Sequence, residues 1–487
     1  MRLPRQRTGD SRTPSSPAHG EHAVVLGASM SGLLAARVLS DYFDQVTVVE
    51  RDRLPEEGRP RRGVPQARHA HLLLARGGQI IDELFPGFGR ELVEAGVPYA
   101  EGLDQFHFEV NGHVFFHDPD DERSRRPEVE GVLLQPSRPL LDAALLRRIR
   151  QLPNVEFLDG CDVEQVTTNS TMTRVSGAWI ASRDAASIRR SLPADLVVCA
   201  TGRSSRATAW LKAMGYAPPQ EEELVVGLKY ATRRVRLPSG SLDHLRGMLV
   251  GPTPERPVGA FAFAQESGTW IVTLQGYNGH HPPLGPDEWL AFADRVMPPH
   301  IAEPLHEAEP LEDPHQHRFP ANLRRHYEKL TRFPDGFLVT GDALASFNPV
   351  YGQGMTVAAM EALALRDSLE HGSDHLAHRF FKAAAKPVND AWQFAAGGDL
   401  ALPEKIVPGP RPLPVRMING YVERVSAAAE HDPVMAWRFF DVTGFDAPTA
   451  TLFSPDSLRR LAQDRRHHRR TAAPTKAMAA AKGWTWP

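Results

Sequence analysis

A short run of small residues near the start of the chain is typical of a site that binds nucleotide phosphates. Residues 27–32 read GASMSG, directly after the apolar stretch 23–26 and before apolar residues at helical spacing. In the pattern Gly-x-Gly-x-x-Gly the first glycine permits a tight turn, the second lets backbone approach a pyrophosphate, and the third lets helix and strand pack closely. Gly27 and Gly32 hold the first and third positions, and the small Ser29 holds the second. We expect the N–H groups of the following helix to face the phosphates.

An acidic side chain follows at the distance that nucleotide recognition requires. Residues 46–49 form a second apolar strand, and Glu50 closes it, near the ~20-residue spacing at which a carboxylate accepts hydrogen bonds from ribose hydroxyls. Arg51 comes next and is a further candidate for the same nucleotide. A glycine-bearing turn and a surface glutamate also coincide by chance, since short motifs produce false positives. The first motif alone leaves that alternative open.

A second glycine-rich run lies near residue 350 and predicts contact with a flat ring. Asp342 follows the apolar strand 336–340, and residues 347–355, FNPVYGQGM, open a long helical stretch. A planar ring is approached closely only by backbone without Cβ atoms, which explains Gly352 and Gly354. The N-terminus of the following helix stabilises negative charge on such a ring. A glycine loop that merely caps a core helix is the alternative, and the presence of both motifs disfavours it.

Together the two motifs resemble those of the single-component flavoprotein monooxygenases, a group that includes aromatic hydroxylases and olefin epoxidases. The likeness covers residues 22–369 and is closest to the polyether olefin epoxidase branch in residues 64–71 and 325–328. It implies that the cofactor is FAD and that Asp342 binds its ribityl chain. It also implies that the backbone of residues 349–355 lies against the isoalloxazine ring.

The same resemblance implies further contacts with FAD. Residues 61–66, RRGVPQ, resemble the loop that brings backbone to the flavin, with arginine toward the pyrophosphate, and Arg138 resembles another contact. Arginine suits this role because its planar fork pairs with two phosphate oxygens. Residues 200–206, ATGRSSR, resemble a strand end of the family, but Thr201 stands where aspartate is usual, which leaves the route of reduction by NAD(P)H open. The candidate cofactor-binding residues are Gly27, Ser29, Gly32, Glu50, Arg51, Arg61, Arg62, Gly63, Arg138, Thr201, Gly202, Asp342, Pro349, Gly352, Gln353, Gly354 and Met355.

Histidines and cysteines do not predict a metal site. His69 and His71 lie at the start of an expected helical run, 71–84, where a spacing of two points them to different sides, and no acidic or cysteine cluster accompanies them. The histidine pair at 467–468 lies among arginines, which is typical of a solvated charge run. Cys161 and Cys199 lack Cys-x-x-Cys pairing and fit a reducing cytoplasm. We therefore expect no metal.

The elements that carry these motifs alternate strand and helix. Residues 22–49 predict the first βαβ unit of a doubly wound parallel sheet. Between residues 225 and 273, β-rich runs separated by turns predict an antiparallel sheet. The expected fold is α/β: a Rossmann-like FAD-binding domain with an inserted antiparallel β-sheet substrate domain and a C-terminal helical region. The expected parts are a flexible tail at 1–21, the FAD-binding domain at 22–215 and 331–372, the substrate domain at 216–330, and the helical region and tail at 373–487.

Size and composition exclude several other classes of protein. A chain of 487 residues exceeds what one core supports, and 41% hydrophobic with 24% charged residues is an ordinary globular balance. The formal net charge of −3 gives no attraction to nucleic acid or anionic membranes. The N-terminal residues lack the apolar core of a secretory signal, and no stretch approaches the roughly 20 apolar residues that cross a bilayer. We expect a cytoplasmic protein without a nucleic-acid partner or transmembrane segment.

The resemblance implies that the cofactor supplies the chemistry, by transfer of one oxygen atom from O₂ through a flavin C4a-hydroperoxide. No side chain stands out as a catalytic base, which favours an epoxidation or hydroxylation that needs none. Electrons are expected from NAD(P)H, directly or through a separate flavin reductase. Two alternatives stay open: an FAD-dependent reductase or dehydrogenase of prenyl-type substrates, and a non-catalytic flavin-binding carrier or sensor.

Aromatic residues in the predicted middle sheet indicate a lipophilic, largely uncharged substrate of secondary metabolism, such as a polyketide or isoprenoid with an olefin or an electron-rich ring. Phe261, Phe263 and Trp270 are the candidate pocket residues, since such pockets are mostly apolar. Alternating aromatics in a strand are more often ordinary core, which is the competing interpretation.

Overall fold

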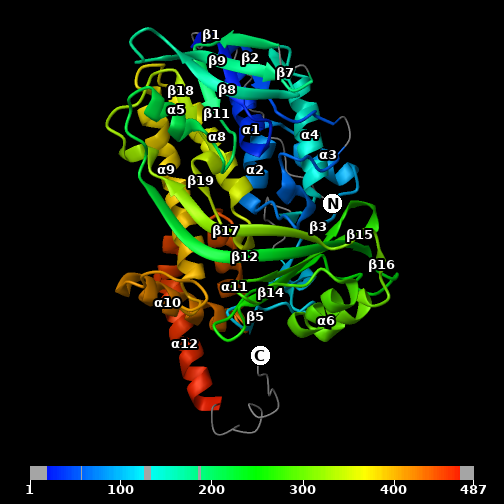
Figure 1. Cartoon of the computed structure of the whole chain (residues 1–487). Helices are drawn as coiled ribbons and strands as arrows, with labels where there is room; N and C mark the ends of the chain where they lie inside the picture. The colour runs from blue at the N-terminus through cyan, green and yellow to red at the C-terminus, as the bar shows by residue number, and fades with distance from the viewer. Residues whose placement is uncertain (1–18, 56–57, 126–132, 185–187, 472–487) are drawn as a thin grey trace.

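The first layer of the fold is a parallel sheet in a computed structural model that describes residues 19–55, 58–125, 133–184 and 188–471. Its strand order is β18-β11-β1-β2-β7 (Figure 1). These strands are apolar and largely buried, as expected for a parallel sheet covered on both faces. The strands are β1 (Gly20–Leu26), β2 (Phe43–Val49), β7 (Val155–Leu158), β11 (Leu196–Cys199) and β18 (Phe337–Val339). This sheet confirms the predicted Rossmann-like layer.

Helices and a small second sheet cover the parallel sheet. α1 follows β1 across the glycine turn, and the long α8 packs against α1, α2 and α9. The three-stranded sheet β10-β9-β8 packs against β11 and β2. The helices here are α1 (Met30–Leu39), α2 (Ala75–Leu84), α3 (Phe88–Glu94), α4 (Arg138–Arg150), α5 (Ala207–Ala213), α8 (Gly354–Leu369) and α9 (Leu376–Asp399), and the strands are β8 (Cys161–Thr168), β9 (Val175–Ser182) and β10 (Arg189–Pro193). Two short strands, β3 (Tyr99–Ala100) and β6 (Leu133–Leu134), pair with each other.

A nine-stranded sheet forms the second layer, with the order β19-β17-β12-β15-β14-β13-β4-β5 and β16 paired to β12. Helices α6 (Pro286–Val296) and α7 (Pro299–Ala302) cover one face, where Trp289 is fully buried. The strands are β4 (Phe106–Val110), β5 (His113–Val114), β12 (Glu221–Arg236), β13 (Gly247–Val250), β14 (Val258–Gln265), β15 (Thr269–Gly276), β16 (Glu309–Pro310), β17 (His315–Arg325) and β19 (Ala345–Ser346). Since β4 and β5 precede residue 215, the N-terminal segment contributes strands to this layer as well.

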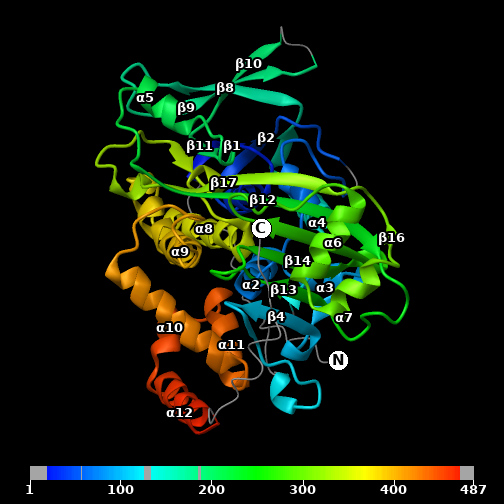
Figure 2. The same cartoon turned by 60° about the horizontal axis from the view of Figure 1, so that its bottom comes forward.

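After α9, three helices of the described part of the chain lie at the end of the molecule opposite the parallel sheet (Figure 1, Figure 2). They are α10 (Leu413–Ala429), α11 (Pro433–Thr443) and α12 (Pro455–Thr471). They confirm the predicted helical C-terminal region. No helix in the described ranges combines the length and apolarity needed to cross a bilayer.

Two predicted boundaries differ from the structure. The flexible tail was expected to reach residue 21, but β1 already begins at Gly20 because it pairs with β2 there; the rest of the expected tail, residues 1–18, lies outside the described residues. The helix expected over residues 71–84 begins only at Ala75. Within the expected helical region and tail at 373–487, residues 472–487 also lie outside the described residues.

Candidate functional site

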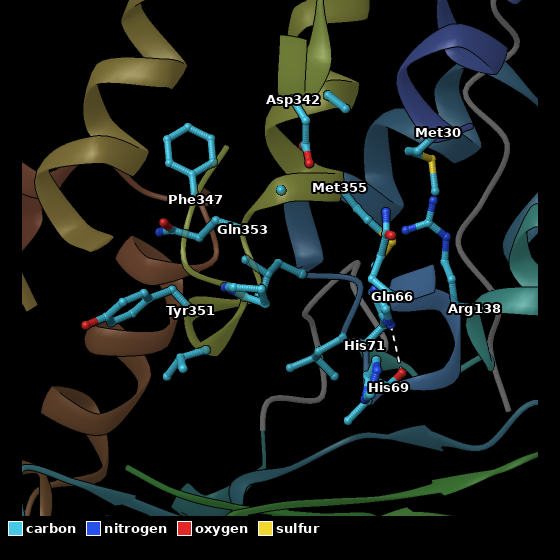
Figure 3. Close-up of a pocket in the computed structure, with 18 of the residues that line it drawn as sticks. Met30, Gln66, His69, His71, Arg138, Asp342, Phe347, Tyr351, Gln353 and Met355 are labelled. Carbon is cyan, nitrogen blue, oxygen red and sulfur yellow. Dashed lines mark hydrogen bonds between the residues drawn. The ribbon is translucent and has the colours of Figure 1, made fainter. Parts of the chain in front are cut away.

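A cavity of about 1010 Å³ lies where the carboxyl ends of the parallel strands, the antiparallel sheet and the C-terminal helices meet. Doubly wound folds bind their ligands at this end of the sheet. Figure 3 shows part of the wall, with Asp342, Arg138, His69 and Tyr351 surrounding the space. Most of the candidate cofactor-binding residues line this one cavity: Gly27, Ser29, Glu50, Arg51, Gly63, Arg138, Thr201, Gly202, Asp342, Pro349, Gly352, Gln353, Gly354 and Met355.

The glycine turn after β1 has the geometry that a phosphate site requires. Gly27 has a φ of +105°, which L side chains rarely adopt, and a Cβ there would lie 2.5 Å from the carbonyl oxygen of Ala200. A Cβ on Gly32 would lie 1.9 Å from the carbonyl oxygen of Gly27, so this glycine lets α1 pack against the turn without itself lining the cavity. Ser29 is the N-cap residue of α1 and does line it.

Glu50 lines the cavity and also holds the turn in place. Its Oε2 accepts a hydrogen bond from Ala28 N–H at 2.8 Å, and its Oε1 accepts one from Asp52 N–H at 3.0 Å. The buried Arg61 guanidinium lies 3.6 Å from Glu50 Oε2 and donates to the Ala28 carbonyl at 2.9 Å. Arg61 thus stabilises the turn on the side away from the cavity and does not line the cavity. Arg62 is exposed and lines a separate hollow on the surface. The structure therefore places neither arginine at the cavity wall.

Asp342 points into the cavity from the turn after β18 (Figure 3). Its carboxylate is reached from the cavity but is surrounded by protein, so burial raises its pKa, and Arg138 and Arg203 partly offset the shift. No hydrogen bond joins this carboxylate to another residue in the described part of the chain. Arg138 is oriented by Asp142, at 2.8 Å from Nε, and donates from Nη2 to Ser29 Oγ at 3.0 Å. An unpartnered carboxylate and a fixed guanidinium fit a ligand that carries hydroxyls and phosphates.

The loop before α8 presents backbone to the cavity. Gly352 has a φ of +66°, which strains any L side chain, and a Cβ on Gly354 would meet no protein atom within 4 Å and would project into open space. The side-chain Oε1 of Gln353 is buried without a hydrogen-bond partner among the described residues. Such a surface accommodates a flat ring, and the Gln353 oxygen is available to accept a hydrogen bond from it.

Asp399, the last residue of α9, holds this loop in place through hydrogen bonds. It is fully buried and accepts hydrogen bonds from Tyr277 at 3.1 Å, Asn322 at 2.7 Å, Asn348 at 2.8 Å and Tyr351 at 3.2 Å. Burial raises the pKa of Asp399 to about 6, although these four donors oppose the shift. Asn348 and Tyr351 belong to the loop, so one carboxylate ties the loop to the antiparallel layer and to α9.

Glu361 has a similar role at the neighbouring turn. It lies on α8 and accepts hydrogen bonds from Thr340 Oγ1 and Gly341 N–H, both at 2.6 Å. Burial raises its pKa to about 7. These bonds shape the turn from which Asp342 projects. Thr201, where the family pattern has aspartate, lines the cavity, while its hydroxyl lies 3.3 Å from the buried Cys199 thiol.

Known proteins resemble this chain in sequence and in fold. No model of a known protein family matches the chain. Protein Rv3254 of Mycobacterium tuberculosis (strain ATCC 25618 / H37Rv) is 38% identical over 424 residues, which cover 85% of this chain and 88% of that protein. The chain belongs to the family of Protein Rv3254.

Solved structures show the fold that this family has. The flavin-dependent brominase Bmp2, as a triple mutant, aligns with a TM-score of 0.62 at 15% identity, over 91% of this chain and 99% of that chain. A flavoprotein/dehydrogenase from Cytophaga hutchinsonii aligns with a TM-score of 0.62 at 16% identity, over 92% and 100%. The p-nitrophenol 4-monooxygenase PnpA from Pseudomonas putida DLL-E4 aligns with a TM-score of 0.61 at 17% identity, over 88% and 98%. The chain therefore has the fold of flavin-dependent monooxygenases and halogenases, and the comparisons do not single out the olefin epoxidase branch.

The cavity continues past the loop into an apolar chamber. Phe261 and Phe263 on β14 line it, as the sequence predicted. The opposite wall comes from α10 and α11, including Val422 and Phe440, and the ring of Phe440 lies 4.4 Å from that of Phe108 on β4. No motif in the C-terminal region indicated this contribution, because apolar residues on a helix are equally typical of ordinary core.

Trp270 was predicted to face the pocket, and this prediction is wrong. In the pairing of β14 with β15, Trp270 lies opposite Ala264, whereas Thr273 lies opposite Phe261. Directly opposed residues share one face of an antiparallel sheet, and successive residues alternate between faces. Trp270 is therefore on the face that α6 covers, packed against that core, and Thr273 lines the cavity instead.

Histidines at the chamber wall were not identified as site residues from the sequence. His69, His71 and His317 all line the cavity. The expectation that helical spacing points the first two to different sides rested on a helix that is not there, because residues 69–74 are not helical, and both residues line the cavity. Among the described residues no group of three or more potential ligands is arranged to hold a metal ion. The side chains of the pair at 467–468 lie outside the described ones.

Proposed function

We propose that the protein is an FAD-dependent monooxygenase that transfers one oxygen atom from O₂ to a lipophilic small molecule, by olefin epoxidation or by hydroxylation. The observation that carries this proposal is the continuity of one cavity. The glycine turn, Asp342 and the loop before α8 line one half, and the apolar chamber forms the other. A cofactor bound in the first half would then contact a substrate bound in the second half with no solvent between them.

The residues of the first half fit FAD. Asp342, unpartnered among the described residues, would accept hydrogen bonds from the ribityl hydroxyls, and Glu50 would accept them from the adenosine ribose. Arg138 and the N-terminus of α1 would hold the pyrophosphate. The Cβ-free backbone at Gly352 and Gly354 admits the isoalloxazine. When bound and reduced, FAD supplies the activation of O₂.

The protein's own part in the reaction is positioning and the exclusion of water. Phe261 and Phe263 on one wall and Phe439 and Phe440 on the other bury a lipophilic substrate. The N-terminus of α8, which begins at the loop, would stabilise negative charge on the reduced ring. We further propose NAD(P)H as the electron donor, acting directly or through a separate flavin reductase.

Oxygen uptake decides between this function and its rivals. The purified protein is loaded with FAD, and NAD(P)H-dependent O₂ consumption is measured with lipophilic olefins and phenols, using isotopically labelled O₂. We expect substrate-stimulated uptake and one labelled oxygen atom in the product. Oxidation of NAD(P)H with reduction of the substrate and no label would indicate a reductase. FAD binding without any turnover would indicate a carrier or sensor, and failure to bind FAD would overturn the proposal.

A further inference from the structure

The three histidines of the chamber wall come from two segments that meet there. His69 and His71 follow the short helix η1 (Pro65–Arg68), and His317 lies on β17. The ring centroids of His69 and His317 are 5.2 Å apart. Neither Nε2 of His71 nor the ring nitrogens of His317 bond to any residue in the described ranges. The wall is thus a polar patch in a chamber that is otherwise largely aromatic and aliphatic.

A chain of hydrogen bonds that starts at the backbone reaches the ring of His69. Ala70 N–H donates to Thr273 Oγ1 at 3.2 Å, Thr273 Oγ1 lies 2.7 Å from Thr232 Oγ1, and Thr232 Oγ1 lies 2.7 Å from His69 Nδ1. Each of these hydroxyls can donate in either direction, and one of the two arrangements has Thr232 donating to His69 Nδ1. A neutral imidazole carries one proton, so in that arrangement the proton lies on His69 Nε2.

A backbone carbonyl sets the tautomer of His71. Its Nδ1 lies 2.9 Å from the carbonyl oxygen of His69, the bond drawn in Figure 3. A carbonyl only accepts, so Nδ1 carries the proton and Nε2 is an acceptor. Burial, reinforced by nearby His317 and Arg138 respectively, lowers the pKa of His69 to about 3 and that of His71 to about 4. Both rings are therefore neutral near pH 7. His71 Nε2 is an acceptor, and His69 Nε2 is a donor when Thr232 donates to His69 Nδ1.

We propose that His69 and His71 form a donor–acceptor pair that selects a neutral hydroxyl group on the lipophilic substrate. A hydroxyl accepts from His69 Nε2–H and donates to His71 Nε2, whereas an ether or a ketone only accepts. A carboxylate cannot donate, and the neutral rings offer its charge no compensation. The inference rests on the proposed function and adds to it a substrate class, lipophilic alcohols or phenols, and the two residues that recognise it.

Binding of three matched probes tests the pair. Naphthol, its methyl ether and naphthoate are titrated by calorimetry into the protein as purified, without NAD(P)H. We expect naphthol to bind about tenfold or more tightly than the ether, because the ether leaves the His71 acceptor unsatisfied in a desolvated site. Equal affinities for naphthol and the ether, or tightest binding of naphthoate, would overturn the proposal.

Variants assign the preference to individual residues. His71→Phe keeps a ring but removes the acceptor, so the preference for naphthol over the ether should fall to about twofold or less. Thr232→Val removes the donor to His69 Nδ1 and should weaken the preference in part, which covers the case in which His71→Phe does not fold. Trp270→Phe, on the opposite face of the same sheet, is the matched control and should leave the preference unchanged.

This experiment separates the two proposals because it needs no turnover. A clear preference for naphthol in a protein that consumes no O₂ would refute the monooxygenase and leave the histidine pair standing. Substrate-stimulated O₂ uptake in a protein that binds naphthol and its ether equally would support the monooxygenase and refute the histidine pair. A preference that persists in both His71→Phe and Thr232→Val would place the recognising groups elsewhere.

Discussion

The two halves of the cavity are built from different parts of the chain. The cofactor half, which is the glycine turn, Asp342 and the loop before α8, presents mainly backbone, and Gly27, Gly32 and Gly352 are required there because a Cβ would collide or strain the chain. In the chamber the wall consists of side chains from the antiparallel sheet, from α10 and α11, and from His69 and His71 after η1. Where the backbone conformation or a close approach excludes a Cβ, the sequence must have glycine at that position. An apolar wall can instead be formed by many different residues. The first kind of site is therefore visible in a sequence, and the second depends on tertiary contacts.

The largest effect should come from breaking the backbone half. In Gly32→Ala the new Cβ would lie 1.9 Å from the carbonyl oxygen of Gly27, so α1 must move away from the turn. We expect a loss of about 3 kcal/mol or more in the free energy of unfolding and no retained FAD, measured by urea titration and by flavin absorbance. Gly78→Ala is the matched control, because its Cβ would meet only a Leu73 methyl group at 3.9 Å. Its stability should rise by about 0.5–1 kcal/mol.

Asp399, at the junction of the two halves, should make stability depend on pH. Its pKa is raised from 3.8 to about 6, so the folded state holds a proton that the unfolded state has released. The free energy of unfolding should therefore fall as pH rises from about 4 to about 6, by up to about 3 kcal/mol, and this contribution is constant above that range. Asp399→Asn should flatten the fall in urea titrations across pH. The pKa of Glu361 is raised to about 7, so Glu361 should cause a second fall in the free energy of unfolding that extends to about pH 7. Glu361→Gln should remove this second fall and leave the one caused by Asp399 in place.

Asp342 is the side chain that we propose contributes most to binding of FAD. Asp342→Ala removes a charge-assisted hydrogen bond of roughly 1.5–3 kcal/mol, so the dissociation constant for FAD should rise by about one to two decades. Quenching of flavin fluorescence during titration of the apoprotein measures this constant. An unchanged value would show that another group binds the ribityl chain.

The smallest effects should come from the chamber, where one side chain is readily replaced by another. Phe261→Leu should raise KM for a lipophilic substrate about threefold to tenfold, since it removes part of one apolar contact. Trp270→Phe should leave KM unchanged because that side chain packs under α6. Steady-state O₂ uptake compares the two variants. Equal increases in KM would mean that the effect is transmitted through the sheet and does not arise at the wall.

Sequence reasoning succeeded where a local pattern determines the structure. The turn at Gly27, the strand before Asp342 and the helix after Gly354 form as predicted, because strand, turn and helix signals there involve residues that are near neighbours. Trp270 was misassigned because the pairing of β14 with β15 decides which face it occupies, and one strand does not reveal its partner's register. His71 was misjudged because the start of α2 was placed four residues too early.

Other parts of the site had no local signal at all. Arg61 pairs with Glu50 and Asp142, and only the folded chain shows that it lies behind the turn. The bonds that Asp399 accepts join residues 48 to 122 positions away in sequence. The wall from α10 and α11 likewise depends on how α10 packs against β5 and how Phe440 of α11 packs against Phe108 of β4.

The position of Asp399 also sets where this chain can be recombined with its relatives. The turn between α8 and α9 looks like a natural boundary, because the residues proposed to hold the cofactor precede it and the C-terminal wall of the chamber follows it. A chimera joined there would pair Asp399 of one parent with Tyr277, Asn322, Asn348 and Tyr351 of the other. Joined instead after Asp399, in the segment that precedes α10, it would inherit all five from a single parent. Recombination that exchanges the C-terminal wall, and with it the range of substrates, should therefore give folded proteins most often when the crossover lies between residues 400 and 412. This applies in evolution and in the laboratory.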